Sequence, residues 1–286
     1  MDNYIKKFTA GLDRDGKSIH TIIAYKKDLE QMSTYSKNHG ATSVKDIGED
    51  LLRGYFDELK KENLSAKTIS RKLNSARTFF KYLQELKVVD KNPAILITHP
   101  KINPVVPRIL TELEYRALRD AARPDRRTYL IIEILLQTGI RIGELCRIRM
   151  EDLHMNKKSA NLVITAYGST TRREIPLNEQ AIDIFKEYLT IRPEIAKCDN
   201  IFITKNGNPL LVRNIRTSID NTFKKAGINN AKVNDLRNTF IAHHLARGTN
   251  IFVLSKIIGH KRIATTEKYL GKIKLNSDKV TTLPVL

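Results

Sequence analysis

The chain has 286 residues, of which 41% are hydrophobic, so it is long enough for two packed domains and too apolar for wholesale disorder. Its 50 lysines and arginines against 31 acidic residues give a formal charge of +19, which indicates a polyanionic partner such as nucleic acid, although a basic protein with a solvated surface has the same balance. The two cysteines, Cys146 and Cys198, lack CxxC spacing, which argues against a disulfide framework or a cysteine zinc site, and the most apolar run is too short to cross a bilayer. We therefore expect a cytoplasmic protein with no membrane segment and no metal.

The first ninety residues have a helical pattern, and we predict an all-α domain over residues 1–90. Proline-free segments with spaced apolar residues lie near 3–12, 18–38, 45–62 and 65–86. In the last segment an i, i+4, i+7 spacing predicts one buried stripe, made of Ile69, Leu73, Ala76, Phe80 and Leu83. Another face of the same helix has phosphate-binding chemistry and no acid, with Lys67, Arg71, Asn74, Thr78 and Lys81. That face is either a DNA contact through Lys67, Arg71 and Lys81 or a solvated helix surface.

A proline-containing linker is expected over residues 91–108, because four of the nine prolines lie there. The remainder, 109–286, predicts an α+β, mainly helical domain with a small β-sheet. Thr111 and Glu114 have the spacing of a capping box, and a strongly apolar helix follows near 125–138. Strands are expected at 160–166 and 172–177 around a turn at 167–169, with a short strand at 201–203. Further helices are expected near 178–191, 212–226, 234–247, 250–258 and 263–271.

This second domain contains the residue types that metal-free cleavage of DNA requires. Arginine neutralises a phosphate best, because its planar fork donates two hydrogen bonds and stays charged. A tyrosine oxygen can attack phosphorus and leave a covalent phosphodiester, while other donors stabilise the transition state and protonate the departing sugar oxygen. Three segments offer such groups: Gly139-Ile140-Arg141-Ile142-Gly143-Glu144-Leu145, Leu236-Arg237-Asn238-Thr239-Phe240, and the stretch from Ile257 through His260 to Tyr269.

These three segments, in this order, resemble the signature boxes of the tyrosine recombinase (phage integrase) family, and the nine-residue offset from His260 to Tyr269 resembles its Xer-like members. The resemblance covers nearly the whole chain and implies a core-binding domain followed by a catalytic domain. It implies that Tyr269 forms a 3′-phosphotyrosyl link, that Arg141 and Arg237 grip the phosphate, and that His260 donates a hydrogen bond to it. Glu144 would orient an arginine, and Arg173 matches a family arginine that contacts the DNA backbone. We also expect Arg172 to contact DNA, and we expect His243, at a position that is often histidine in the family, to be structural.

Two positions depart from the family pattern. The family has a catalytic lysine in the turn between the two strands, where this chain has Gly168, and no lysine lies between Lys158 and Lys186. Lys157, Lys158 and Arg172 are possible substitutes, although a guanidinium is a poor proton donor at neutral pH. Three residues before the second arginine the family has His or Lys, and this chain has Asn234, which donates hydrogen bonds but shuttles no proton.

The sequence therefore predicts a site-specific recombinase that acts on a double-stranded DNA target as a homotetramer, is a monomer or dimer when free, and needs no cofactor. A second interpretation is a catalytically impaired DNA-binding relative on the same fold, which the altered turn and Asn234 favour and the intact Tyr269 opposes. A third is a helix-turn-helix transcription regulator, which the basic charge favours but which leaves the three ordered segments unexplained.

Overall fold

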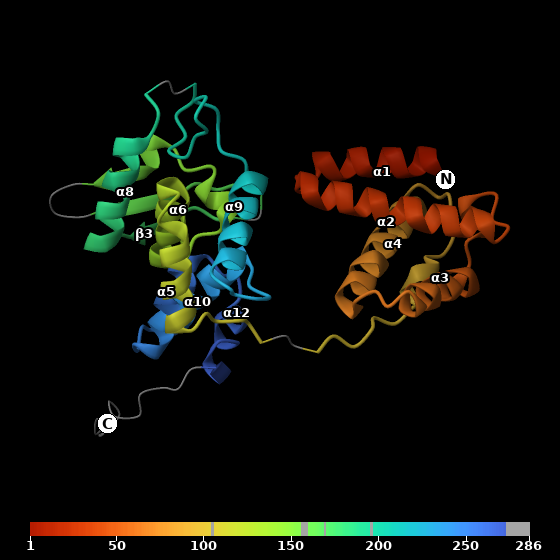
Figure 1. Cartoon of the computed structure of the whole chain (residues 1–286). Coiled ribbons are helices and arrows are strands. Elements are labelled where there is room, and N and C mark those ends of the chain that lie inside the picture. Colours follow the sequence, from red (N-terminus) through yellow and green to blue (C-terminus); the bar gives the residue numbers. More distant parts are fainter. Residues whose placement is uncertain (104–105, 156–159, 169, 195–196, 273–286) are drawn as a thin grey trace, which may run out of the picture. The chain divides into compact units, whose positions relative to one another are not determined.

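The computed structural model describes residues 1–103, 106–155, 160–168, 170–194 and 197–272 (Figure 1). It divides the chain into two compact units, Met1–Pro104 and Val105–Leu286. The described part contains no helix with the length and apolar character needed to span a membrane.

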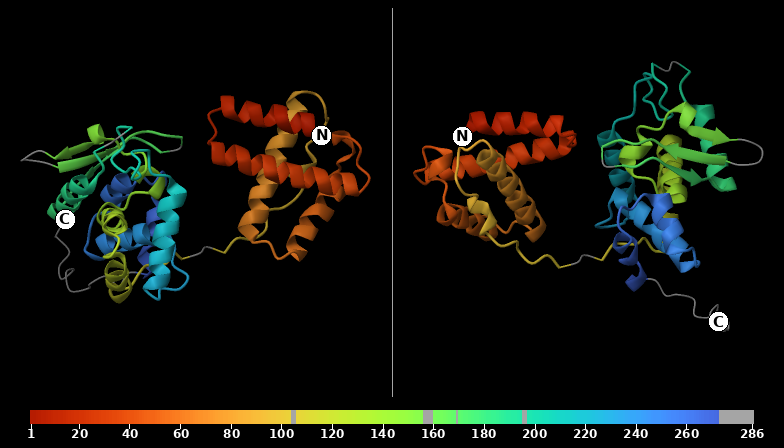
Figure 2. Two further views of the ribbon diagram at one scale, coloured as in Figure 1. Left: turned by 45° about the horizontal axis from the view of Figure 1, so that its top comes forward. Right: turned by 180° about the vertical axis from the view of Figure 1, so that it is seen from behind.

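The first unit is helical, with α1 (Asp2–Arg14), α2 (Ile19–Asn38), α3 (Glu49–Lys61) and α4 (Ala66–Glu85). The helix α2 runs beside α1, and α4 packs against α1, α2 and α3 (Figure 2). The predicted helix near 45–62 is divided into a 3-10 turn, Val44–Asp46, and α3, because Gly48 is extended and becomes the N-cap of α3. All five residues of the predicted stripe on α4 are at most 4% exposed, so that prediction is confirmed.

Two basic residues on the predicted DNA-contacting face of α4 have acidic partners within the chain. The Arg71 guanidinium pairs with the carboxylate of Asp28, a buried residue of α2, and Lys81 lies 3.8 Å from Glu85. Lys72, on a neighbouring face, also reaches Asp28 at 3.1 Å. Acidic partners from α2 and from the end of α4 therefore neutralise part of this face, whereas Lys67 is exposed and has no ion pair within the described part of the chain.

The proline-rich segment begins as part of the first unit. A 3-10 turn at Pro93–Ile95 packs on α4, and Ala94 and Ile97 are buried. Arg77 of α4 donates to the carbonyl oxygens of Ala94 at 3.0 Å and Ile97 at 2.6 Å. These bonds satisfy the backbone acceptors that a proline-containing segment leaves outside regular structure.

The second unit surrounds the apolar helix α6 (Arg126–Thr138). Around it pack α5 (Glu112–Ala122), α8 (Glu179–Ile191), α9 (Val212–Lys225) and α10 (Val233–Ala246), and they are followed by α11 (Ile251–Ile258) and α12 (Ala264–Glu267). The capping box of Thr111 and Glu114 at the start of α5 is present as predicted. A short helix, α7 (Ile142–Leu145), follows α6 directly, and 3-10 turns lie at Met150–Asp152 and Leu270–Lys272.

A three-stranded antiparallel sheet of order β1-β2-β3 lies beside these helices (Figure 2), formed by β1 (Leu153–Met155), β2 (Ala160–Ile164) and β3 (Arg173–Pro176). In the register Leu162 lies opposite Ile175, and both side chains are buried in the core. Because β3 also contacts α11, its first residue, Arg173, is brought to the C-terminal end of that helix.

Two predicted elements of the second unit differ from the structure. Residues 201–203 form no named strand but only an isolated bridge from Ile203 to Pro209, because the chain reverses within the next few residues and leaves no room for a longer ladder. The helix predicted over 263–271 is interrupted: α12 ends at Glu267, and Tyr269 precedes the 3-10 turn at Leu270–Lys272.

Candidate active site

The first of the three motif segments makes a sharp turn at the end of α6. Gly139 caps this helix in the left-handed conformation, with φ 61°. A Cβ at this position would lie 2.3 Å from the Phe240 ring of α10, so only glycine fits both the conformation and the contact. The turn puts Arg141 at the N-cap of α7, where its side chain is half-exposed.

Glu144 joins two arginines from different parts of the chain. Its carboxylate accepts the Arg141 backbone N–H at 2.8 Å and the Arg141 Nη1 at 2.9 Å. It also accepts Arg173 Nη2 at 2.7 Å and Nη1 at 3.1 Å. Burial would raise the pKa of Glu144, but the bonds from Arg173 and from the Arg141 backbone outweigh burial and lower that pKa. Glu144 is therefore ionised at neutral pH, and it holds both guanidinium groups through hydrogen bonds.

Arg237 and Arg173 both meet the C-terminal end of α11, where backbone carbonyls are left without partners inside the helix. Arg237 donates to the carbonyl oxygen of Gly139 at 2.6 Å and to that of Ile258. Arg173 Nε donates to the carbonyl oxygen of Ile257 at 2.8 Å. Burial, with the charges of Arg141 and Arg173, lowers the pKa of Arg237 to about 9, so this guanidinium is still charged at pH 7.

His260 lies just after Gly259, the left-handed residue that ends α11. Its Nδ1 is 2.8 Å from the hydroxyl oxygen of Thr266, a fully buried residue of α12. Burial lowers the pKa of His260 to about 4, with further lowering by the charges of Arg237, Arg141 and Arg173. The imidazole is therefore neutral at pH 7 and has one N–H to donate.

Tyr269 is 6% exposed and packs in a small apolar cluster with residues of α10 and α11. Its hydroxyl donates to Asn238 Oδ1 at 2.8 Å. Burial raises the pKa of Tyr269, Arg237 and Arg141 lower it, and Asp235 raises it. Segments more than 120 residues apart in the sequence thus come together, with Arg141, Arg173, Arg237, His260 and Tyr269 around the end of α11.

Other predicted residues lie elsewhere or have a different environment. Arg173 is in the cluster but its side chain is only 7% exposed and its donors meet Glu144 and Ile257, an arrangement that favours a bracing role. Arg172 is exposed, 3.9 Å from Glu174. Gly168 lies in an exposed turn with φ 56°, and Lys157 and Lys158 lie outside the described residues. Lys67, Arg71 and Lys81 belong to the first unit.

Sequence reasoning missed the groups that hold the predicted residues in place. Asn238 follows Arg237 directly and contacts Tyr269, yet its type alone gave no signal. Thr266 contacts His260 from within the Thr-Thr-Glu-Lys-Tyr stretch. The carbonyl oxygens of Gly139, Ile257 and Ile258 are backbone groups, so no residue type announces them.

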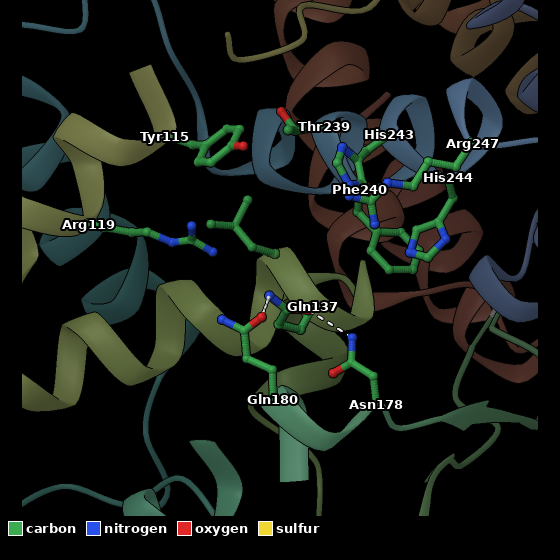
Figure 3. A pocket seen from close by; sticks show the side chains of 11 residues that line it. Tyr115, Arg119, Gln137, Asn178, Gln180, Thr239, Phe240, His243, His244 and Arg247 are labelled. Carbon is green, nitrogen blue, oxygen red and sulfur yellow. Dashed lines mark hydrogen bonds between the residues drawn. The ribbon is translucent and has the colours of Figure 1, made fainter. Parts of the chain in front are cut away.

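A separate pocket of about 290 Å³ lies on another face of α10 (Figure 3). Tyr115 and Arg119 of α5 line it opposite His243 and His244 of α10 and Arg247, the C-cap of that helix. His243, which we expected to be structural, is exposed and lines this pocket. Burial lowers the pKa of both histidines, followed by the Arg247 charge at His243 and by the charges of His243 and Arg247 at His244.

The geometry defines a site for an anion beside a tyrosine. The three guanidinium groups of Arg141, Arg173 and Arg237 outnumber the nearby carboxylates of Glu144 and Asp235, and His260 is neutral, so positive charge exceeds negative charge here. Arginine clusters bind phosphate oxygens, and a neighbouring hydroxyl can attack phosphorus. The fold and the site therefore define the class of protein: an enzyme in which a tyrosine attacks a phosphodiester, such as that of a DNA strand, and transfers it.

Comparison with known protein families supports this class. The sequence profile of the phage integrase family matches residues 108–274, and that of the phage integrase N-terminal SAM-like domain matches residues 5–87. The chain belongs to the phage integrase family and is a tyrosine-type site-specific recombinase, as its motifs predicted.

Two relatives are named tyrosine recombinase XerC. The tyrosine recombinase XerC of Staphylococcus carnosus is 29% identical over 91% of each chain, and the XerC of Staphylococcus saprophyticus is 30% identical over 91% of each chain. Among solved structures, a lambda integrase dimer bound to a core site shares the fold, with a TM-score of 0.75 and 16% identity over 100% of this chain and 98% of that chain. The predicted combination of a helical domain with a mainly helical α+β domain is confirmed.

Proposed function

We propose that this recombinase cuts double-stranded DNA through Tyr269. The hydroxyl oxygen of Tyr269 attacks the scissile phosphorus, the bond from phosphorus to the 5′ oxygen breaks, and a 3′-phosphotyrosyl link and a 5′ hydroxyl result. A 5′ hydroxyl from the other duplex then attacks the phosphotyrosine and releases Tyr269. Because the covalent link keeps the energy of the phosphodiester bond, the exchange needs no ATP and no other cofactor.

The observation that best supports this proposal is the convergence of Arg141, Arg237 and His260 with Tyr269 at the end of α11. We assign the two arginines to the non-bridging phosphate oxygens, where their charge stabilises the transition state. If the Thr266 hydroxyl donates to His260 Nδ1, the imidazole proton is on Nε2, and Nε2 donates to the phosphate. Glu144 keeps Arg141 and Arg173 in place.

The described residues offer no strong proton donor for the departing 5′ oxygen. No lysine stands in the turn at Gly168, and Asn234, which is exposed, donates to Asn238 at 3.1 Å and holds no titratable proton. We propose that cleavage proceeds with a weakened or displaced general acid. A substrate with sulfur in place of the bridging 5′ oxygen needs no such acid, because a thiolate leaves without a proton. We expect it to be cleaved faster than the oxygen substrate, and equal rates would contradict a weakened acid.

We further propose a homotetramer on two duplexes, since exchange of both strands needs four cleavages, and a monomer or dimer without DNA. Light scattering of the protein with and without synapsed target duplexes measures this directly. Arg172 and the exposed α4 residues Lys67, Arg71 and Lys81 are proposed backbone contacts, Arg71 being the least available because it pairs with Asp28. A DNA role for Arg173 is the least supported, since its donors are occupied by protein acceptors.

Covalent trapping tests the proposal. The protein is incubated with nicked duplexes taken from DNA beside its own gene, and complexes are separated under denaturing conditions. We expect a DNA-linked band that disappears in Tyr269→Phe while DNA binding persists. Sequence-specific binding without any covalent band would instead support the catalytically impaired relative.

A further inference from the structure

The Tyr269 hydroxyl ends a chain of side-chain hydrogen bonds on α10. Asn238 Oδ1 accepts from Tyr269 at 2.8 Å and from Asn234 Nδ2 at 3.1 Å. Asn238 Nδ2 donates to Asp235 Oδ1 at 3.0 Å, and Asp235 Oδ2 accepts the Lys232 backbone N–H at 2.8 Å. Asn238, Asp235 and Tyr269 are all less than 8% exposed, so the bonds among these three side chains are shielded from water, whereas Asn234 is exposed.

This network fixes the direction of every bond within it. The Asp235 carboxylate is an acceptor, so the NH₂ group of Asn238 must face it. The amide oxygen of Asn238 therefore faces Tyr269, and the phenol must be the donor. An amide oxygen does not take up a proton at ordinary pH, so this contact holds the hydroxyl without deprotonating it.

We propose that Asn238 is the positioning residue for the nucleophile: its amide oxygen, locked by Asp235 and Asn234, holds the Tyr269 hydroxyl in one place as a neutral phenol. The inference rests on the proposed role of Tyr269 in cleavage. Asn238 touches neither phosphate nor DNA in this scheme, and it acts only through the tyrosine. Because the attacking oxygen is already held in place, less conformational entropy is lost when it reaches the geometry for attack on phosphorus.

The proposal predicts how the pKa of Tyr269 depends on the groups around its hydroxyl. Arg237 and Asp235 face it from α10 and Arg141 from the N-cap of α7, whereas the α11 residues packed in its cluster are apolar. A bond accepted from a neutral phenol stabilises the protonated form and opposes ionisation. Removal of the Asn238 acceptor should therefore lower the pKa of Tyr269, since the arginine charges remain.

Two variants shift this ionisation in opposite directions. Asn238→Ala removes the acceptor. Asp235→Asn combined with Asn238→Asp exchanges amide and carboxylate, so the bonds to Tyr269 and Lys232 are retained while a negative charge meets the phenol. Ionisation is followed by the absorbance of phenolate, as the difference between each protein and the same protein with Tyr269→Phe. We expect a lower midpoint for Asn238→Ala than for the parent protein and a higher midpoint for the exchanged pair.

Cleavage of nicked duplex in a single turnover gives the second readout. At neutral pH we expect Asn238→Ala to form the covalent product about twofold to tenfold more slowly, which corresponds to one net hydrogen bond. Its alkaline rise in rate should move to lower pH, and that of the exchanged pair to higher pH. A purely structural defect would scale the rate by one factor at all pH values.

The outcomes separate this inference from the proposed function. Loss of the covalent product in Tyr269→Phe tests the nucleophile by itself. If that loss occurs but both Asn238 variants keep the parent midpoint and profile, the positioning role is wrong and Tyr269 remains the nucleophile. Because the exchanged pair keeps every bond, it tests the positioning role even if Asn238→Ala fails to fold, as judged by circular dichroism and DNA binding.

Discussion

Glu144 holds the arginine cluster together through charge as well as geometry. Its side chain is 1% exposed and accepts four hydrogen bonds, from Arg141 and Arg173. We expect Glu144→Gln to lower the free energy of unfolding by about 3 kcal/mol, because it leaves buried Arg173 without its counter-charge. Urea denaturation measures the loss. Glu174→Gln is the control: Glu174 is exposed and 3.9 Å from Arg172, so the change should stay within about 0.5 kcal/mol. Similar losses in both variants would contradict the bracing role.

His260 should be neutral throughout the physiological range. Burial, with three nearby arginines, lowers its pKa from the ordinary 6.5 to about 4. Since the unfolded chain binds this proton more readily, the contribution of His260 to stability is complete above the unfolded pKa and is lost as pH falls from about 6.5 towards 4. NMR titration of the DNA-free protein, assigned with His260→Asn, should show no protonation of this ring above pH 5.5. A midpoint near 6.5 would refute the environment described here.

Among the elements, the turn from α6 into α7 is the most demanding. Gly139 and Gly168 have nearly the same φ, 61° and 56°, but a Cβ would meet the Phe240 ring at Gly139 and nothing within 4 Å at Gly168. We expect Gly168→Ala to cost about 1 kcal/mol, from the left-handed conformation alone. Gly139→Ala should cost about 2–5 kcal/mol, since overpacking adds to strain, and should impair cleavage through the displaced Arg237 partner. Thermal unfolding and covalent trapping compare the two, and equal costs would count against the contact.

The sequence predicted the helices more completely than it predicted the contacts within the candidate site. Periodic apolar spacing and capping residues predicted α4 and α5 because both depend on local sequence. The segment at 201–203 and the break beside Tyr269 depend on distant contacts, which a local pattern does not contain. For the site, the motifs predicted Arg141, Arg237, His260 and Tyr269, and these residues remain a proposal. The sequence could not show that Arg173 is buried against Glu144 or that Asn238 contacts Tyr269.

At the scale of the whole molecule, a formal charge of +19 should dominate DNA binding. Each phosphate neutralised releases counterions, so we expect affinity to fall at least about a hundredfold between 50 and 200 mM salt. Lys67→Ala with Lys81→Ala should reduce the salt slope by about two units if both lysines contact phosphate. Lys37→Ala, which removes a lysine of α2 that is paired with Asp2, is the control. A flat salt response, or equal slopes for α4 and control variants, would contradict these contacts.

The most direct test of cleavage through Tyr269 is to locate the covalent bond. Trapped complexes are digested with nuclease and protease, and the peptides are sequenced by mass spectrometry. We predict a nucleotide attached through its 3′ phosphate to Tyr269. A nucleotide on another residue, or on Tyr269 through a 5′ phosphate, would contradict the proposed chemistry.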